Sequence, residues 1–154
     1  MITFRVHGTP KPGGSKKAFV HPHAKNKAGK PMVIVMDACK GNKEWRDAVA
    51  AAAREAYEGP LLGSPLVFSV EFYLPRPKSH YGTGKKSDVL KLSAPKYHTK
   101  SPDLTKLLRS TEDALTGVVW RDDAQVVETL VGKRYDKITG ASITISELSR
   151  GEAP

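Results

Sequence analysis

Residues 103–116 carry the clearest helical pattern in the sequence. Pro102 precedes the segment and Gly117 ends it, and both are residue types favoured at those helix boundaries. One stripe of this helix carries its apolar side chains, with one threonine: Leu104, Leu107, Leu108, Thr111 and Leu115. The opposite side is polar, with Lys106, Arg109, Ser110 and Asp113. A helix with one apolar stripe must be covered by another layer, so the rest of the chain has to provide that surface.

The remaining segments predict that this surface is a small sheet. Hydrophobic periodicity predicts strands over 2–7, 66–74, 125–135 and 141–148, and the last two are expected to pair as a hairpin. A polar connection at 21–31 is expected to join Phe19-Val20 to the apolar run 32–36. An alanine-rich helix is predicted over 40–58. The predicted fold class is α+β, with a small mixed or antiparallel sheet packed against two main helices. We expect one domain over 1–150 and a frayed tail over 151–154.

Residues 75–102 have no clear periodicity, although they lie between two regular elements. A stretch this long inside a small domain is usually functional or disordered. It carries many lysines, and because it is long and irregular we expect it to be mobile in the absence of a ligand.

The charges are unevenly distributed. Residues 1–102 hold 18 Lys and Arg against 7 Asp and Glu, whereas residues 103–154 hold 7 against 9. This asymmetry favours a polyanionic partner and a local acidic site. The alternative is a surface that only maintains solubility. The single cysteine, Cys39, excludes an intrachain disulfide and a cysteine-based zinc site, and the sequence predicts no membrane span or signal peptide.

Three aspartates are candidates for metal chemistry. Asp103 begins the strong helix, and Asp122 and Asp123 follow it in a turn. If the chain doubles back, these carboxylates could bind Mg²⁺, which prefers oxygen ligands. Each also has a simpler interpretation, because an acid is favoured at a helix start and Asp-Asp is common in turns. Lys106 and Arg109 could hold a phosphate, or could belong to an ordinary solvated helix face.

Three segments together resemble the RusA family of Holliday junction resolvases. They read PDLTKLLR at 102–109, DALTG at 113–117 and WRDDAQVV at 120–127. The opening GTPKP at 8–12, Phe72 with the segment 75–80, and a lysine near Lys133 also fit. The resemblance implies homodimeric α+β endonucleases that bind four-way DNA junctions and cut them with Mg²⁺ or Mn²⁺. It places the family's catalytic aspartates on Asp103 and Asp123, its phosphate-side basic residue on Arg109, and its helix aspartate on Asp113.

The sequence departs from the family at two positions. The family usually has Asp-x-Asp at the start of this helix, but here the second position is Thr105. A hydroxyl can contact a metal ion without bringing a charge, so Mg²⁺ binding should weaken unless Asp122 or Asp113 compensates. Arg109 stands where a lysine is typical, which keeps the charge and changes its shape.

We therefore expect a Mg²⁺-dependent, structure-selective endonuclease that acts as a homodimer on four-way DNA junctions in recombination or repair. Its catalytic residues would be Asp103, Asp123, Arg109 and Lys106, and its metal ligands Asp103, Asp123, Asp122 and Thr105. The DNA contacts would be Arg5, Lys11, Lys16, Lys17, Arg76, Lys78, Lys85 and Lys86.

The expected location is the bacterial cytoplasm, with a phage or prophage origin open. Two other functions stay open. Thr105 would suit a junction-binding protein that cuts weakly or not at all. A basic chain could also bind single-stranded nucleic acid, which needs exposed aromatics such as Tyr81 and Tyr97.

Overall fold

The computed structural model describes residues 1–14, 16–37 and 39–149. The sequence expectation for a tail at 151–154 lies outside these residues. Four strands form the main sheet: β1 (Ile2–His7), β4 (Leu66–Leu74), β5 (Val126–Tyr135) and β6 (Gly140–Glu147). Their order is β1-β6-β4-β5, with β4 parallel to β5 and the other neighbours antiparallel. The predicted α+β class with a mixed sheet is confirmed.

The predicted pairing of the last two strands as a hairpin is wrong, because β4 lies between them. Val70 of β4 is in register with Ile143 of β6 on one side and with Val131 of β5 on the other. Every second side chain of β4 is fully buried, from Leu66 to Leu74. The most apolar strand therefore buries most surface when it lies inside the sheet, where both of its edges are also hydrogen-bonded to neighbouring strands. The chain between β5 and β6 crosses the end of β4, where Asp136 N–H donates to the Leu74 carbonyl at 2.9 Å.

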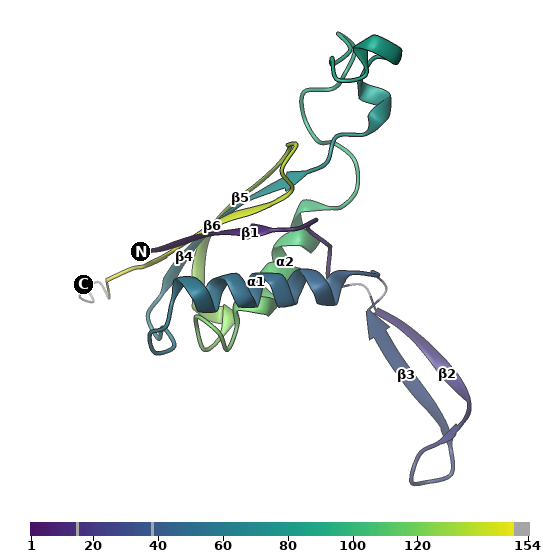
Figure 1. The fold of residues 1–154 in the computed structure, drawn as a ribbon. Helices are drawn as coiled ribbons and strands as arrows, with labels where there is room; N and C mark the ends of the chain where they lie inside the picture. The colour runs from purple at the N-terminus through teal and green to yellow at the C-terminus, as the bar shows by residue number, and fades with distance from the viewer. Residues whose placement is uncertain (15, 38, 150–154) are drawn as a thin grey trace.

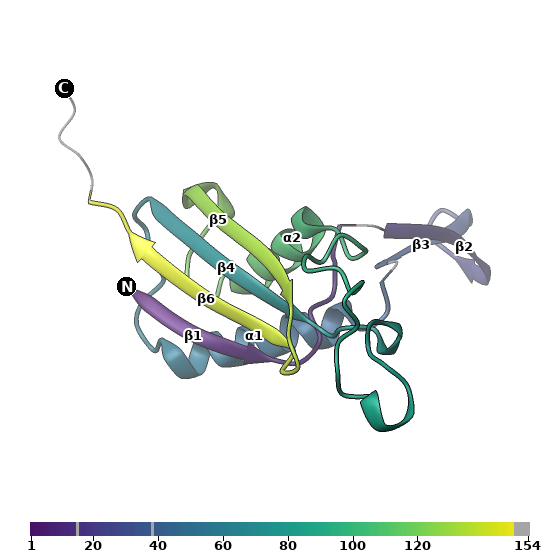
Figure 2. The ribbon, with the colours of Figure 1, turned by 90° about the horizontal axis from the view of Figure 1, so that it is seen from above.

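Two helices cover one face of this sheet, α1 (Asn42–Ala56) and α2 (Leu104–Leu115), as Figure 2 shows. Both predicted helices are confirmed. Each begins and ends within two residues of the predicted boundaries, 40–58 for α1 and 103–116 for α2. Trp45 of α1 is buried against the sheet, and its indole N–H donates to Thr111 of α2 at 3.3 Å. Ser110, expected on the polar side of α2, is fully buried instead, because α1 packs against that side as well.

Two arms project from the same end of the domain and diverge (Figures 1 and 2). One is the hairpin of β2 (Lys16–Lys25) and β3 (Pro31–Asp37), whose strands pair only with each other among the described residues. Its turn is shorter than expected, because the strand continues past Pro22 to Lys25. The pairing with β3 is irregular between Val20 and Lys25, where His21 Nδ1 accepts from the N–H groups of His23 and Ala24. The other is the irregular segment 75–102, which contains only the short 3₁₀ turns η1 (Lys78–His80) and η2 (Gly84–Lys86).

No helix within 1–14, 16–37 or 39–149 is long and apolar enough to cross a membrane.

Candidate functional site

The two arms meet the body at the N-terminus of α2, where Asp103 lies. Asp103 immediately precedes the helix, and its carbonyl accepts the first helical hydrogen bond, from Leu107 N–H at 3.1 Å. Its carboxylate is exposed and lies 3.5 Å from the ammonium group of Lys106. Thr105, in the first turn, is exposed as well. The predicted acid, hydroxyl and lysine therefore share one accessible helix end.

Residues 9–14 form a strap that crosses α2 beside this end. Gly13 N–H donates to the Lys106 carbonyl at 2.9 Å. Gly14 has a φ of +85°, and a Cβ there would lie 3.1 Å from Cδ of Arg109. The strap therefore needs glycine at this crossing, and it restricts where the Arg109 side chain can lie. Lys11, a predicted DNA contact, belongs to the same strap.

Lys133 of β5 fixes the opposite side of this helix end. Its ammonium group donates to the carbonyls of Lys100 and Pro102, each at 2.8 Å. The chain that follows α2 does return along the helix, as the sequence suggested. It brings Lys133 of β5, and neither Asp122 nor Asp123, to the residues just before Asp103.

Asp122 and Asp123 lie at the other end of α2. Asp122 begins the 3₁₀ turn η3 (Asp123–Gln125) and accepts from Ala124 N–H at 2.8 Å. Asp123 lies near Glu112, which belongs to the last turn of α2. The pKa of Glu112 is raised, first by burial of its carboxyl and then by the negative charges of Asp123 and Asp113. Within one chain, Asp103 and Asp123 are therefore separated by most of the length of α2, which is about 18 Å.

The carboxylates of one chain do not form a closed metal cage. Within the described ranges, no group of three or more His, Cys, Asp or Glu side chains is placed to hold a metal ion. Asp103 and Thr105 offer one carboxylate and one hydroxyl at an exposed helix end. This donor set fits a water-rich Mg²⁺ ion, which is often held by one or two carboxylates together with substrate phosphates.

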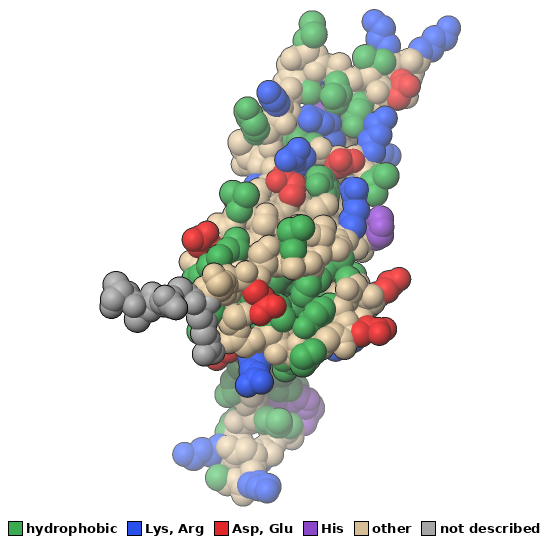
Figure 3. Space-filling view, turned by 90° about the vertical axis from the view of Figure 1, so that its left-hand side faces the viewer, with side chains coloured by type: hydrophobic (Ala, Val, Ile, Leu, Met, Phe, Trp, Pro, Cys, Tyr) green, Lys and Arg blue, Asp and Glu red, His purple; other side chains and the backbone are tan. Residues whose placement is uncertain are grey.

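Most of the predicted DNA contacts lie on the two arms. Lys16 and Lys17 are on β2, while Lys78, Lys85 and Lys86 are on the segment 75–102. Figure 3 shows blue side chains on both arms and most of the red ones on the body between them. Lys25, Lys27 and Lys30 end β2 and follow it around the hairpin tip. They belong to the basic loop 9–30, which the sequence predicts to hold phosphates, but they are not among the eight contacts named individually. The basic composition of 21–31 was the available signal.

Two predicted DNA contacts have protein partners. The guanidinium of Arg76 lies 4.1 Å from the ring centroid of Tyr135 and donates to the Pro95 carbonyl at 2.7 Å. Arg5 lies on β1 with its guanidinium 4.9 Å from the Tyr73 ring. Arg76 therefore holds the base of its arm, and Arg5 lies on the main sheet and not on an arm.

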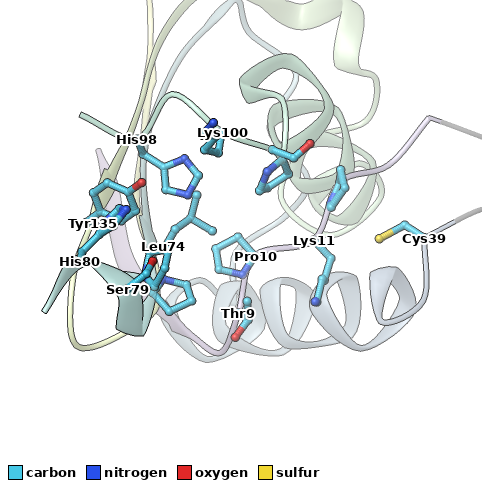
Figure 4. A pocket seen from close by; sticks show the side chains of 15 residues that line it. Thr9, Pro10, Lys11, Cys39, Leu74, Ser79, His80, His98, Lys100 and Tyr135 are labelled. Carbon is cyan, nitrogen blue, oxygen red and sulfur yellow. The ribbon is translucent and has the colours of Figure 1, made fainter. Parts of the chain in front are cut away.

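A cavity next to the start of α2 was missed by sequence reasoning. It has a volume of about 580 Å³ and lies where the strap, the segment 75–102 and the end of β5 meet. His98, Tyr135 and Lys100 line it (Figure 4). The pKa of His98 is lowered, first by burial and then by the nearby charge of Lys133. No local pattern could have found this site, because it joins residues from four distant segments.

Comparison with known proteins defines the class. The Endodeoxyribonuclease RusA family matches residues 16–146, so the chain belongs to that family. The matched range includes α2, both arms and both aspartate positions. The chain is also 29% identical to the uncharacterized protein YqaN of Bacillus subtilis (strain 168), over 96% of this chain and 97% of that protein.

Proposed function

We propose that this protein is a structure-selective endonuclease that cuts four-way DNA junctions in a reaction dependent on Mg²⁺, with Mn²⁺ as a substitute. Membership of the RusA family supports an endodeoxyribonuclease. The observation that carries the proposal is the exposed start of α2, with Asp103 and Lys106, at the base of two diverging basic arms. Arg109 follows in the middle of the helix, beside the strap.

The arms would hold the DNA and the end of α2 would hold the scissile phosphate. Lysine contacts to phosphates give affinity without sequence information, which suits recognition by shape. The Lys106–Asp103 ion pair is exposed on both sides and therefore weak, so Lys106 can turn to a phosphate. Arg109, restricted by the strap, would stabilise the charge that develops on the phosphate oxygens.

Asp103 and Thr105 would hold the metal ion, which supplies an activated water and neutralises charge at the phosphate. Asp123 lies at the far end of α2, so we propose that it joins this site only across a homodimer. A two-fold pair of chains would bring Asp123 of one protomer to Asp103 of the other. A two-fold dimer also matches a junction of approximate two-fold symmetry.

Cleavage of a synthetic mobile four-way junction tests the proposal, with linear duplex as the reference substrate. We expect paired nicks on the junction that require Mg²⁺ or Mn²⁺ and disappear in Asp103→Asn. Asp136→Asn, which changes an aspartate in the β5–β6 turn, is the matched control and should cut normally. Full activity in Asp103→Asn, or equal cutting of linear duplex, would contradict the proposal.

The second candidate is a junction-binding protein with little or no cleavage, and Thr105 is the observation that favours it. In that case the wild-type chain would bind the junction tightly and leave it intact. Thr105→Asp restores the carboxylate, so cleavage that begins only in Thr105→Asp would establish this second function.

A further inference from the structure

The cavity beside α2 has the wall chemistry of a site for a small planar molecule. Its volume of about 580 Å³ lies within the range of small-molecule sites. Leu74 and several prolines give it rigid apolar walls: Pro10, Pro12, Pro75, Pro77 and Pro102. Tyr135, His80 and His98 form one aromatic side. Such walls favour a flat, largely apolar body.

His98 lines this aromatic side and carries a buried ring nitrogen that has no partner in the described part of the chain. The residue is 9% exposed, and its Nδ1 has no hydrogen-bond partner among the residues that the structure describes. Its ring centroid lies 4.6 Å from that of Tyr135. Figure 4 shows the ring between Lys100 and Leu74. Burial and the nearby charge of Lys133 lower the pKa of His98 and favour the neutral imidazole.

The aromatic side is held in place by the protein itself. Arg76 covers Tyr135 from one side at 4.1 Å, and His80 meets the same ring edge-on at 5.6 Å. Arg76 is in turn fixed to the Pro95 carbonyl. A ligand would therefore meet a preformed surface, which reduces the ordering cost of binding.

The surroundings of the cavity favour a ligand that carries phosphate. Lys11 and Lys100 are part of its lining. Ser101 and Pro102 also line it, and Pro102 immediately precedes Asp103. A nucleotide has both features, since it joins a flat base with polar edges to an anionic phosphate, and it therefore suits this cavity.

We propose that this cavity receives one unstacked nucleobase of the bound DNA, close to the phosphate held at the start of α2. The inference rests on the proposed function and extends it to the recognition of a base. A nucleotide at a branch point is inexpensive to extrude, because its pairing and stacking are already weakened. The base would lie between the proline walls and the aromatic side formed by His80, His98 and Tyr135.

Photocrosslinking tests the proposal with the full chain in EDTA, where the junction stays uncut. Each branch-point nucleotide of a four-way junction is replaced in turn by 5-iododeoxyuridine or 8-bromodeoxyadenosine, and crosslinked peptides are identified by mass spectrometry. Ser79→Trp fills the cavity from an exposed lining position. Ser87→Trp makes the same change at an exposed position on the same arm, outside the lining. His98→Leu removes the imidazole while keeping an apolar wall.

We expect one branch position to crosslink to a peptide containing Tyr135, His98 or His80, in the wild type and in Ser87→Trp. The yield should fall at least fivefold in Ser79→Trp, while junction affinity changes less than threefold because the arms supply it. His98→Leu should keep the crosslink, because leucine preserves an apolar wall at this position.

Several outcomes would overturn the inference. Crosslinks confined to other peptides, or unchanged in Ser79→Trp, would show that the cavity holds no base. A change of oligomeric state in Ser79→Trp by light scattering, with the same crosslinks, would assign the cavity to a second copy of the chain. In both cases preferential binding of junction over linear duplex would persist, whereas its absence in the wild type would contradict the proposed function itself.

Discussion

The ammonium group of Lys133 donates to the Pro102 carbonyl at 2.8 Å and so ties the end of β5 to the residue before Asp103. The same group binds the Lys100 carbonyl, also at 2.8 Å. This one side chain therefore holds two backbone carbonyls that lie just before the start of α2. The position of Asp103 therefore depends on a lysine that is 30 residues away in the sequence.

Replacing Lys133 with methionine should loosen this helix end. Loss of two hydrogen bonds from a half-buried charged donor should lower the free energy of unfolding by about 1–2 kcal/mol. Proteolysis within 75–101 should become faster, because the segment loses its anchor. Urea denaturation and limited trypsin digestion measure the two effects. Lys137→Met, at an exposed turn position, should change neither, and equal behaviour of the two variants would show that the anchor is unimportant.

Asn42 should be among the most sensitive polar residues of the fold. It is 2% exposed, and its side-chain amide donates to the Pro12 carbonyl at 2.9 Å and to Ser110 Oγ at 2.6 Å. Asn42→Ala should cost about 1–3 kcal/mol of stability, since it leaves buried acceptors without a donor. Ser110→Ala should cost less, and the double variant should cost less than the sum of the two. Strict additivity in urea denaturation would show that the two side chains are not coupled.

Glu112 should make the protein less stable as the pH rises. Its pKa in the folded chain lies above the ordinary value of 4.5, so the folded state binds the proton more tightly than the unfolded state. The free energy of unfolding then falls as the pH rises from about 4.5 through the raised pKa. Glu112→Gln should therefore be more stable than the wild type at pH 7 and show no such gain below pH 4. Thermal unfolding across this range measures it, with Glu128→Gln on β5 as the control for loss of one negative charge.

Asp123→Asn should leave stability equal or higher at pH 7, because it removes a negative charge that faces Glu112. A loss of cleavage in this variant would then reflect function and not unfolding. A marked fall in melting temperature would contradict the placement of Asp123 beside Glu112.

Mixed dimers test whether the site is shared between two chains. Asp103→Asn and Asp123→Asn are each expected to be inactive alone. If Asp103 of one protomer works with Asp123 of the other, a mixed dimer retains one intact site and should nick one strand of a junction. Subunits refolded together from denaturant provide the mixture. Continued inactivity, with mixed dimers demonstrated by differential tagging, would show that the two aspartates do not complete one site across the dimer.

The hairpin tip should contribute to DNA affinity without contributing to stability. Lys25, Lys27 and Lys30 lie at or next to the tip, on an arm whose strands pair only with each other among the described residues. Changing all three to glutamine should weaken junction binding and reduce the dependence of log affinity on log salt by about 0.9 for each phosphate that is no longer neutralised. The melting temperature should stay within about 1 °C. An unchanged salt dependence would exclude the tip from the DNA interface.

Local sequence was sufficient for most elements of this fold. The apolar stripe of α2, the alanine-rich face of α1 and the alternation in β4 are short-range patterns, and each indicates its own element. The two arms were visible in the same way, one as a polar, basic connection before the apolar run 32–36 and the other as a lysine-rich stretch without hydrophobic periodicity. The family motif around Asp103 and Asp123 was also readable, because its three segments lie within residues 102–127.

Only the tertiary structure decided which of these elements meet. Strand order depends on how much apolar surface each arrangement buries. The apolar strand β4 therefore lies between β5 and β6, although a short turn joins those two strands. The same packing placed Lys133 at the start of α2 and left Asp123 at its far end. It also assembled the His98 cavity from distant segments of the chain. Residue types are local properties of the sequence, whereas their distances follow from the burial of the whole core.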